Sequence, residues 1–151
     1  MIKVKQGLPA VLALLLCATA AGAQNSKRQD ANRLEAAVTG LRNDNGVVRC
    51  GLYASADGFR QPGREFRGVV AKIKDGTATC VFGSVPAGTY AMAVFHAEQN
   101  ESRLETGLFG KPKQGYGFSR NPSTSFGPPT FSAASFEFRG GASSVPVRLS
   151  Y

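Results

Sequence analysis

The residues with the greatest chemical potential lie in one stretch, 96–131, which has no repeating hydrophobic period. It holds the only histidine, His96, and three of the ten carboxylates of the chain. Imidazole titrates near neutral pH and can act as a general base. A serine nucleophile needs such a base and an orienting acid, and Ser119 and Glu98 are the partners available. No nucleophile-elbow motif surrounds Ser119, so we favour a strand-end histidine that tethers the following loop by hydrogen bonds.

The centre of the stretch, Gly115-Tyr116-Gly117-Phe118-Ser119, places two aromatic rings between glycines. The rings could form an exposed platform that stacks on a sugar or a peptide. They could instead plug the edge of a β-domain, with the glycines permitting the required backbone angles. We favour the plug, and the solvent exposure of Tyr116 and Phe118 distinguishes the two. No helix follows, so the glycines do not form a phosphate loop.

The N-terminus has the pattern of a signal peptide over residues 1–23. Lys3 and Lys5 precede an apolar run, 8–20, that is short for a membrane span. A small-x-small cleavage signal ends at Ala23. We expect a flexible polar leader at 24–32, a mature protein with no transmembrane segment, and a periplasmic or secreted location.

Cysteine usage agrees with export. Cleavage would remove Cys17 and leave Cys50 and Cys80, an even pair that predicts a disulfide in an oxidising compartment. The loop of about 30 residues would contribute roughly 3–4 kcal/mol in the chain-entropy model. Without a C-x-x-C spacing a redox-active pair is disfavoured, and the cysteines and one distant histidine are too few for structural zinc.

The formal charge of +8 includes two lysines of the predicted signal peptide. The remaining excess could favour an anionic envelope component, although the basic residues are spread along the chain. Another protein is the alternative partner. Nucleic acid is not expected, because the chain is predicted to be exported and has no basic-aromatic cluster.

Alternating apolar residues between turn signals predict short strands throughout residues 33–151, taken as one domain. The expected strands are 34–39, 47–54, 68–74, 77–82, 89–96, 134–139 and 145–151. This pattern predicts an all-β protein, a seven-stranded immunoglobulin- or transthyretin-like β-sandwich with a long irregular loop between strands five and six. A small barrel is the competing architecture, and a parallel sheet is not expected because no crossover helix fits.

Two turn signals predict hairpins. Asn43-Asp44-Asn45-Gly46 should fold the second strand onto the first, and Asp75-Gly76 should join the third to the fourth. Cys50 and Cys80 fall in mid-strand on faces expected to be buried. A bridge would therefore pin strand two to strand four, within one sheet or between two.

Several motifs occur in a characteristic order: Val-Pro-Ala-Gly-Thr-Tyr-Ala at 85–91, then His96, then Gly-Lys-Pro-Lys-Gln-Gly-Tyr-Gly-Phe-Ser at 110–119, then Gly-Pro-Pro-x-Phe at 127–131. This ordered set resembles the DUF2141 family of exported bacterial proteins, over roughly residues 34–151. The resemblance implies an all-β sandwich, a secreted or periplasmic location and no established activity.

The family pattern after the histidine usually has oxygen ligands at alternating positions and a glycine, which resembles the start of a calcium loop. In this chain the corresponding positions are Ala97, Gln99 and Ser102. Glu101 and Glu105 remain as weak metal candidates, too few for a shell of six to eight oxygens. We therefore expect no cofactor, with calcium as the alternative, and carboxylates held by Arg103 and nearby lysines.

The sequence thus predicts an exported, non-enzymatic binding or cell-envelope module that uses residues 96–131 as its interaction surface. Its candidate ligand-binding residues are His96, Glu98, Tyr116, Phe118 and Ser119. The alternative is an envelope-polymer hydrolase centred on His96.

Overall fold

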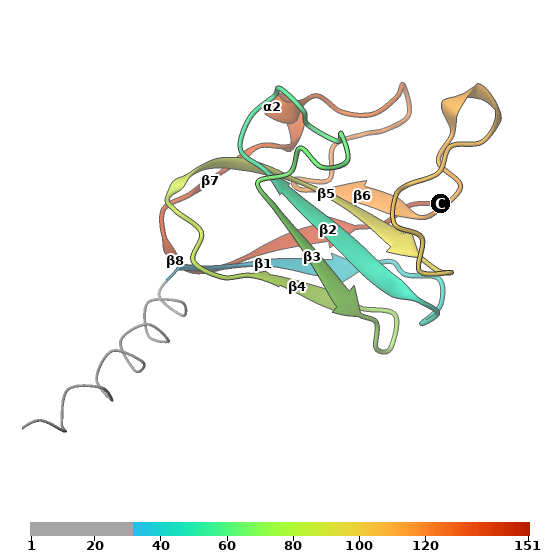
Figure 1. Cartoon of the computed structure of the whole chain (residues 1–151), viewed down its shortest axis with the longest axis horizontal. Helices are drawn as coiled ribbons and strands as arrows, with labels where there is room; N and C mark the ends of the chain where they lie inside the picture. The colour runs from blue at the N-terminus through green and yellow to red at the C-terminus, as the bar shows by residue number, and fades with distance from the viewer. Residues whose placement is uncertain (1–31) are drawn as a thin grey trace, which may run out of the picture.

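The computed structural model describes residues 32–151, which form two β-sheets packed face to face (Figure 1). The strands are β1 (Asn32–Thr39), β2 (Val47–Tyr53), β3 (Arg67–Lys72), β4 (Ala78–Phe82), β5 (Gly88–Ala97), β6 (Tyr116–Phe118), β7 (Phe136–Phe138) and β8 (Gly141–Arg148). The helical elements are the 3-10 turn η1 (Leu108–Gly110) and the helical turn α2 (Phe131–Ala134). The predicted signal peptide, 1–23, and residues 24–31 of the predicted leader lie outside the described residues, and the last leader residue, Asn32, begins β1.

The first sheet has the order β4-β1-β8 and the second β3-β2-β5-β6, with β7 also paired to β5. The all-β prediction is confirmed. An antiparallel bridge between Tyr116 and Ser150 joins β6 to the segment after β8, so the two sheets meet along this edge. Within residues 32–151, no helix is long and apolar enough to cross a membrane.

The main core lies between the sheets and follows the alternation of each strand. On β5, Met92 and Val94 face the other sheet, and Ala91 points to the opposite face, where it is also buried. There a second, smaller cluster covers β5 with Phe59 and Phe118. β5 is therefore covered on both faces.

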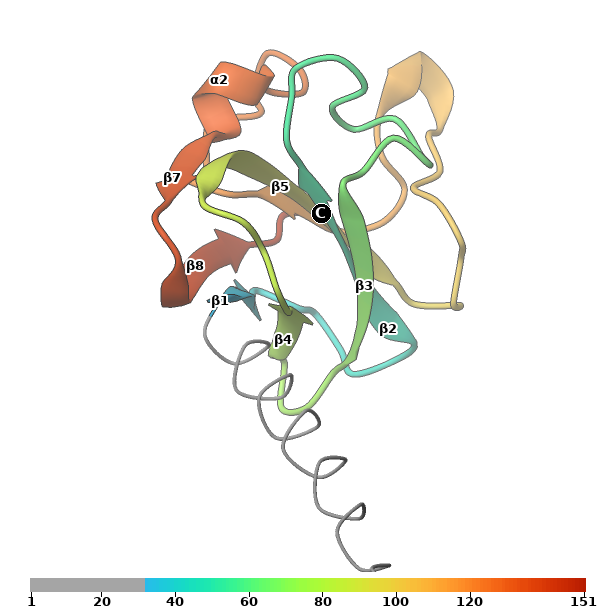
Figure 2. The ribbon, with the colours of Figure 1, turned by 60° about the vertical axis from the view of Figure 1, so that its left-hand side comes forward.

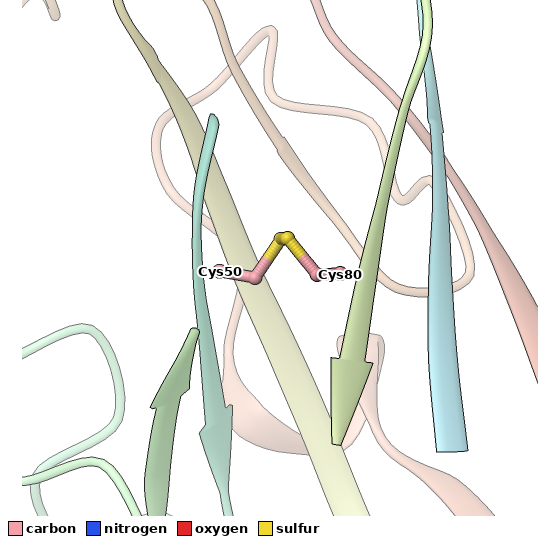
Figure 3. Close-up of a disulfide and its surroundings, with 2 residues drawn as sticks. All are labelled: Cys50 and Cys80. Carbon is pink, nitrogen blue, oxygen red and sulfur yellow. A yellow bond between two sulfur atoms is a disulfide. The ribbon is translucent and has the colours of Figure 1, made fainter. Parts of the chain in front are cut away.

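A disulfide joins Cys50 of β2 to Cys80 of β4 across the core, with an S–S distance of 2.05 Å (Figure 3). The predicted pairing is confirmed, and of the two arrangements left open the bridge takes the one between sheets. Both cysteines are buried, and they are 30 positions apart in the sequence.

The prediction of a hairpin at 43–46 is wrong. Gly46 has a positive φ of 67°, but β1 pairs with β4 and β8, whereas β2 pairs with β3 and β5. The turn at Asp75-Gly76 does form, closed by reciprocal backbone bonds between Lys74 and Thr77. However, β3 and β4 then enter different sheets. Turn residues specify local backbone angles, whereas burial decides which strands pair.

β1 and β8 form a parallel pair, from Asn32 opposite Gly141 to Thr39 opposite Arg148. A parallel sheet was not expected, because consecutive parallel strands need a crossover helix. That reasoning does not apply to strands far apart in the chain, where the rest of the domain is the connection.

The segment expected to be one irregular loop contains β6, which pairs antiparallel with β5. The predicted sixth strand, 134–139, is shorter than expected, because residues 131–134 form α2. Thr130 begins this helical turn by accepting a hydrogen bond from the amide of Ala133 at 3.3 Å. The loop around η1 and the loop between β6 and α2 both extend to the upper edge of the molecule in Figures 1 and 2.

Candidate functional site

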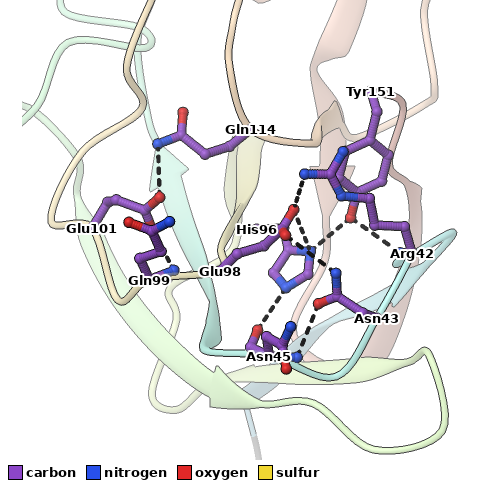
Figure 4. A network of polar contacts seen from close by, with 9 residues as sticks. All are labelled: Arg42, Asn43, Asn45, His96, Glu98, Gln99, Glu101, Gln114 and Tyr151. Atoms are coloured by element: carbon purple, nitrogen blue, oxygen red, sulfur yellow. Dashed lines mark hydrogen bonds and ion pairs between the residues drawn. The ribbon is translucent and has the colours of Figure 1, made fainter.

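His96 is fully buried at the end of β5, and both its ring nitrogens are bonded (Figure 4). Nε2 lies 2.7 Å from the carbonyl oxygen of Asn45, and Nδ1 lies 2.6 Å from the hydroxyl of Tyr151. Because a carbonyl only accepts, Nε2 carries the proton in the neutral ring and Nδ1 accepts from the tyrosine. The tyrosine oxygen accepts in turn from the amide of Arg42 at 3.2 Å.

His96 does tether other segments by hydrogen bonds, as the sequence predicts, but the predicted partner, the following loop, is wrong. The ring hydrogen-bonds to the β1–β2 connection and to Tyr151, and its contact with the loop that follows β5 is the longer one between Nδ1 and the carboxylate of Glu98, at 3.9 Å. That loop is held mainly by other groups: the amide of His96 donates to the carbonyl of Gly115 at 2.8 Å, and the guanidinium of Arg49 donates to the carbonyl of Glu101 at 2.6 Å.

Glu98 extends this arrangement toward the surface. Its carboxylate lies 2.7 Å from the guanidinium of Arg42 and accepts from the side-chain amide of Asn43 at 3.2 Å. Burial alone would raise the pKa of Glu98, but Asn43 and Arg42 together hold it below its ordinary value. Arg42 also lies over the ring of Tyr151, 4.5 Å from its centroid. Burial raises the pKa of the Tyr151 hydroxyl. We refer to His96, Asn45, Tyr151, Arg42, Glu98 and Asn43 as the His96 network.

Glu101 and Glu105 point to different partners. Glu101 accepts from the amide of Gln99 at 2.9 Å and from the side chain of Gln114 at 3.3 Å. These bonds outweigh burial and hold the pKa of Glu101 below its ordinary value. Glu105 pairs with Lys113 at 3.5 Å. No three His, Cys, Asp or Glu side chains within residues 32–151 gather as a metal site.

The cations beside these carboxylates differ from those expected. A lysine does pair with Glu105, as proposed, but Arg42 from the β1–β2 connection holds Glu98 in place of Arg103. The sequence gives no sign of this pairing, because Arg42 and Glu98 are distant in the chain.

Ser119 is fully buried and uses its hydroxyl to join two elements. It accepts from the amide of Met92 at 2.8 Å and donates to the carbonyl of Ala134 at 2.5 Å. The structure therefore does not bring Ser119 and His96 together as a nucleophile and base. Ser119 fixes the end of β6 between β5 and α2.

The two aromatic rings of the central motif lie against the protein. Phe118 is 6% exposed and Tyr116 is half-buried, and their ring centroids are 5.9 Å apart. Phe118 packs with Phe59, which makes edge contacts with Tyr53 and Phe131. Burial, with the charge of Glu65 as a smaller cause, raises the pKa of Tyr53 to about 12. The burial of Phe118 fits the plug interpretation of this ring.

The sequence predicts that Gly115 and Gly117 permit unusual backbone angles, but the structure gives these glycines a steric role instead. Neither Gly115 nor Gly117 has a positive φ. A Cβ on Gly117 would lie 2.4 Å from the carbonyl oxygen of Arg148, and one on Gly115 would lie 2.4 Å from the ring of Tyr151. Gly117 is required because β6 approaches the backbone of β8 closely, whereas a side chain on Gly115 would displace the ring of Tyr151.

A shallow hollow of about 190 Å³ lies beside Tyr116, between β6 and the following loop, with Asn121 and Arg148 on its wall. It is smaller than the few hundred Å³ of most small-molecule sites. A second depression of about 370 Å³ lies over β1 and β8, where Arg33 and Glu35 pair with each other.

The most exposed large apolar side chains were missed by the sequence analysis. Leu108 is 85% exposed, and Phe109 and Phe126 are fully exposed. We refer to them as the apolar crests: Leu108 and Phe109 form the first crest, and Phe126 forms the second. The available signal was a Leu-Phe pair between two glycines, and a lone phenylalanine between serine and glycine, in a segment with no period that could bury them.

Comparison with protein families matches residues 36–146 to a family described as an uncharacterized protein conserved in bacteria, DUF2141. The chain belongs to the DUF2141 family. No curated protein and no solved structure matches it. The resemblance stated from the sequence motifs is therefore confirmed.

The structure gives several DUF2141 motif residues of this chain a physical role. Pro86 offers its carbonyl to the hydroxyl of Tyr90 at 2.9 Å, which closes the turn before β5. His96 anchors the other end of that strand. Gly115 and Gly117 permit β6 to dock. These residues build the frame, and the apolar crests lie on the loops that this frame holds.

Proposed function

We propose that this protein is an exported, non-enzymatic binding module of the cell envelope, and that the loops of residues 96–131 are its interaction surface. The observation that carries the proposal is the position of the apolar crests. Leu108, Phe109 and Phe126 are the three most exposed large apolar residues of the described chain, and all three lie in this segment. Contiguous or protruding apolar groups on a soluble domain commonly mark contact sites.

Binding is favoured over catalysis by the way the polar side chains are used. Both nitrogens of His96 and the hydroxyl of Ser119 are bonded to groups of the frame. Glu98 and Glu101 are likewise bonded to neighbouring side chains. A general base must reach a proton of the substrate, and these groups are directed inward.

Export is supported by two independent features. The N-terminal 23 residues have the charge and apolar pattern of a signal peptide. The disulfide between Cys50 and Cys80 is of a kind that persists in oxidising compartments such as the periplasm. We further propose that the two sheets form a sandwich of immunoglobulin or transthyretin type, which an experimental structure compared with those folds would test.

A pull-down from detergent-solubilised envelope extract tests the proposed surface. The bait is the exported chain, and its variant is Leu108→Ser/Phe109→Ser/Phe126→Ser. Val70→Ser/Val81→Ser is the matched control, because it removes exposed apolar side chains from β3 and β4. We expect the crest variant alone to lose an envelope component that the wild type recovers. Equal recovery of every envelope component, phospholipids included, by all three proteins would contradict the proposal.

A further inference from the structure

The first apolar crest is held out by a closed turn. Residues Thr106 and Pro112 form an antiparallel bridge, and the amide of Gly107 donates to the carbonyl of Lys111 at 2.7 Å. Phe109, at the tip, has a φ of 61°, which is uncommon for a bulky residue. The backbone therefore holds Leu108 and Phe109 in solvent, where their side chains pack against no other part of the described domain.

The second crest is built in a similar way. The amide of Gly127 donates to the carbonyl of Thr124 at 3.2 Å, which closes a turn under Phe126. Pro128 and Pro129 then restrict the return of the chain to α2. The two loops that carry the crests leave opposite ends of the β5–β6 pair, and both extend to the upper edge of the molecule in Figures 1 and 2.

The segment that carries the crests contains charged side chains of one sign only. Residues 106–136 contain Lys111, Lys113 and Arg120 but no aspartate or glutamate, which gives 3 − 0 = +3. Lys111 and Lys113 directly follow the first crest, and Lys113 reaches back to Glu105 just outside this range. Apolar tips with adjacent cations are the composition that proteins use at an anionic lipid surface.

We propose that the apolar crests insert into an anionic phospholipid surface, with Lys111 and its neighbours meeting the phosphate head groups. This inference rests on the proposed function and names the partner of the same surface. Phenylalanine and leucine side chains reach the apolar boundary of a bilayer, while lysine side chains extend to the head groups. A fluid surface accommodates two separate crests without a matching pocket. The neighbouring hollow, at about 190 Å³, is too small to hold a lipid chain.

The first measurement uses fluorescence, because the chain contains no tryptophan. Phe109→Trp places a single reporter at the first crest, and Val70→Trp places one on β3 as the control. The protein is purified after export, with its disulfide intact and its N-terminus established by mass spectrometry. With phosphatidylglycerol vesicles, the emission of Phe109→Trp should shift to shorter wavelength and that of Val70→Trp should not. No shift at the crest would overturn the inference.

Vesicle co-sedimentation measures the same event without a reporter. We expect wild type to bind equimolar phosphatidylglycerol–phosphatidylcholine vesicles more tightly than phosphatidylcholine alone. Leu108→Ser/Phe109→Ser/Phe126→Ser should weaken binding by at least about tenfold, and Val70→Ser/Val81→Ser should not. Lys111→Gln should weaken it by about fivefold, with exposed Lys72→Gln on β3 as the neutral control. Equal binding to the two kinds of vesicle, or by the crest variant and wild type, would overturn the inference.

The two proposals fail in different ways. If wild type ignores vesicles but the crest variant loses a protein recovered in the pull-down, the lipid surface is wrong and the interaction surface stands. If wild type ignores vesicles and the pull-down is unchanged in the crest variant, both are wrong.

Discussion

The His96 network and the apolar crests both draw on residues 96–131, but their side chains are used in opposite ways. In the network, polar groups from β5, the β1–β2 connection and the end of the chain bond one another around the buried ring of His96. At the crests, large apolar side chains face solvent on turns closed by their own backbone. Folding explains the network, whereas it gives no reason for the crests.

This difference reverses the usual expectation that a lone histidine among carboxylates marks the working site. An imidazole whose two nitrogens both bond to other parts of the domain links those segments and stabilises the fold. Exposed phenylalanine on a rigid turn gains nothing from the folded state, because no neighbour removes it from water. A function is the better explanation for the second feature.

The largest expected effect comes from His96→Ala. The substitution leaves the Asn45 carbonyl and the Tyr151 hydroxyl without their partner and opens a cavity at a fully buried position. We expect a loss of about 3 kcal/mol in the free energy of unfolding, measured by chemical denaturation. Tyr151→Phe, which removes one of the bonds, should lose only about 1 kcal/mol. A His96→Ala protein as stable as wild type that had lost a measurable activity would return His96 to a catalytic role.

Gly117→Ala tests how β6 packs against β8. This strand lies in the sequence between the His96 end of β5 and the second crest. The added Cβ would meet the carbonyl of Arg148 at 2.4 Å, so β6 must shift away from β8. We expect a loss of about 2 kcal/mol in the free energy of unfolding. Gly83→Ala is the matched control, because a Cβ there meets nothing within 4 Å and its φ is not positive. Equal stability of the two variants would show that the close approach is not a constraint.

Local patterns in the sequence predicted much of the fold. The alternation of Leu34, Ala36 and Val38 placed β1, and the mid-strand positions of Cys50 and Cys80 predicted their buried disulfide. The strand partners were not predictable, since a turn such as Asp75-Gly76 fixes backbone angles without deciding whether the strands stay in one sheet. The parallel pairing of β1 with β8 depends on the whole domain and has no local signal.

The candidate site was predicted less well for the same reason. The sequence indicated that the 96–131 segment is special, and it identified His96 as a tether. The partners of this histidine, Asn45 and Tyr151, are about 50 positions away in each direction, where no periodicity connects them. The exposure of Phe109 depends on what lies opposite it, which only the packed structure provides.

Acid should weaken the bonds of Glu98, which belongs to the His96 network, and of Glu101 in the following loop, and should leave the crests unaffected. The pKa values of Glu98 and Glu101 lie below the ordinary value of 4.5 in the folded protein. Their contribution is therefore complete above about pH 4.5 and is lost as the pH falls through the lower folded values. We expect the midpoint of urea unfolding to decrease over this range. Glu98→Gln/Glu101→Gln should flatten the dependence, and an unchanged slope in that variant would assign the effect to other carboxylates.

The smallest expected effect, at the crests, separates the two regions most clearly. Phe109 has a φ of 61°, in the left-handed region that suits glycine, and its ring has no neighbour to lose. We expect Phe109→Gly to leave the free energy of unfolding unchanged or to raise it by up to about 1 kcal/mol, because relief of backbone strain offsets the added chain entropy. Phe59→Ala, which removes a buried loop phenylalanine, should lose about 3 kcal/mol in the same assay. A large loss from Phe109→Gly would mean that the crest serves folding, and the contrast with the His96 network would then disappear.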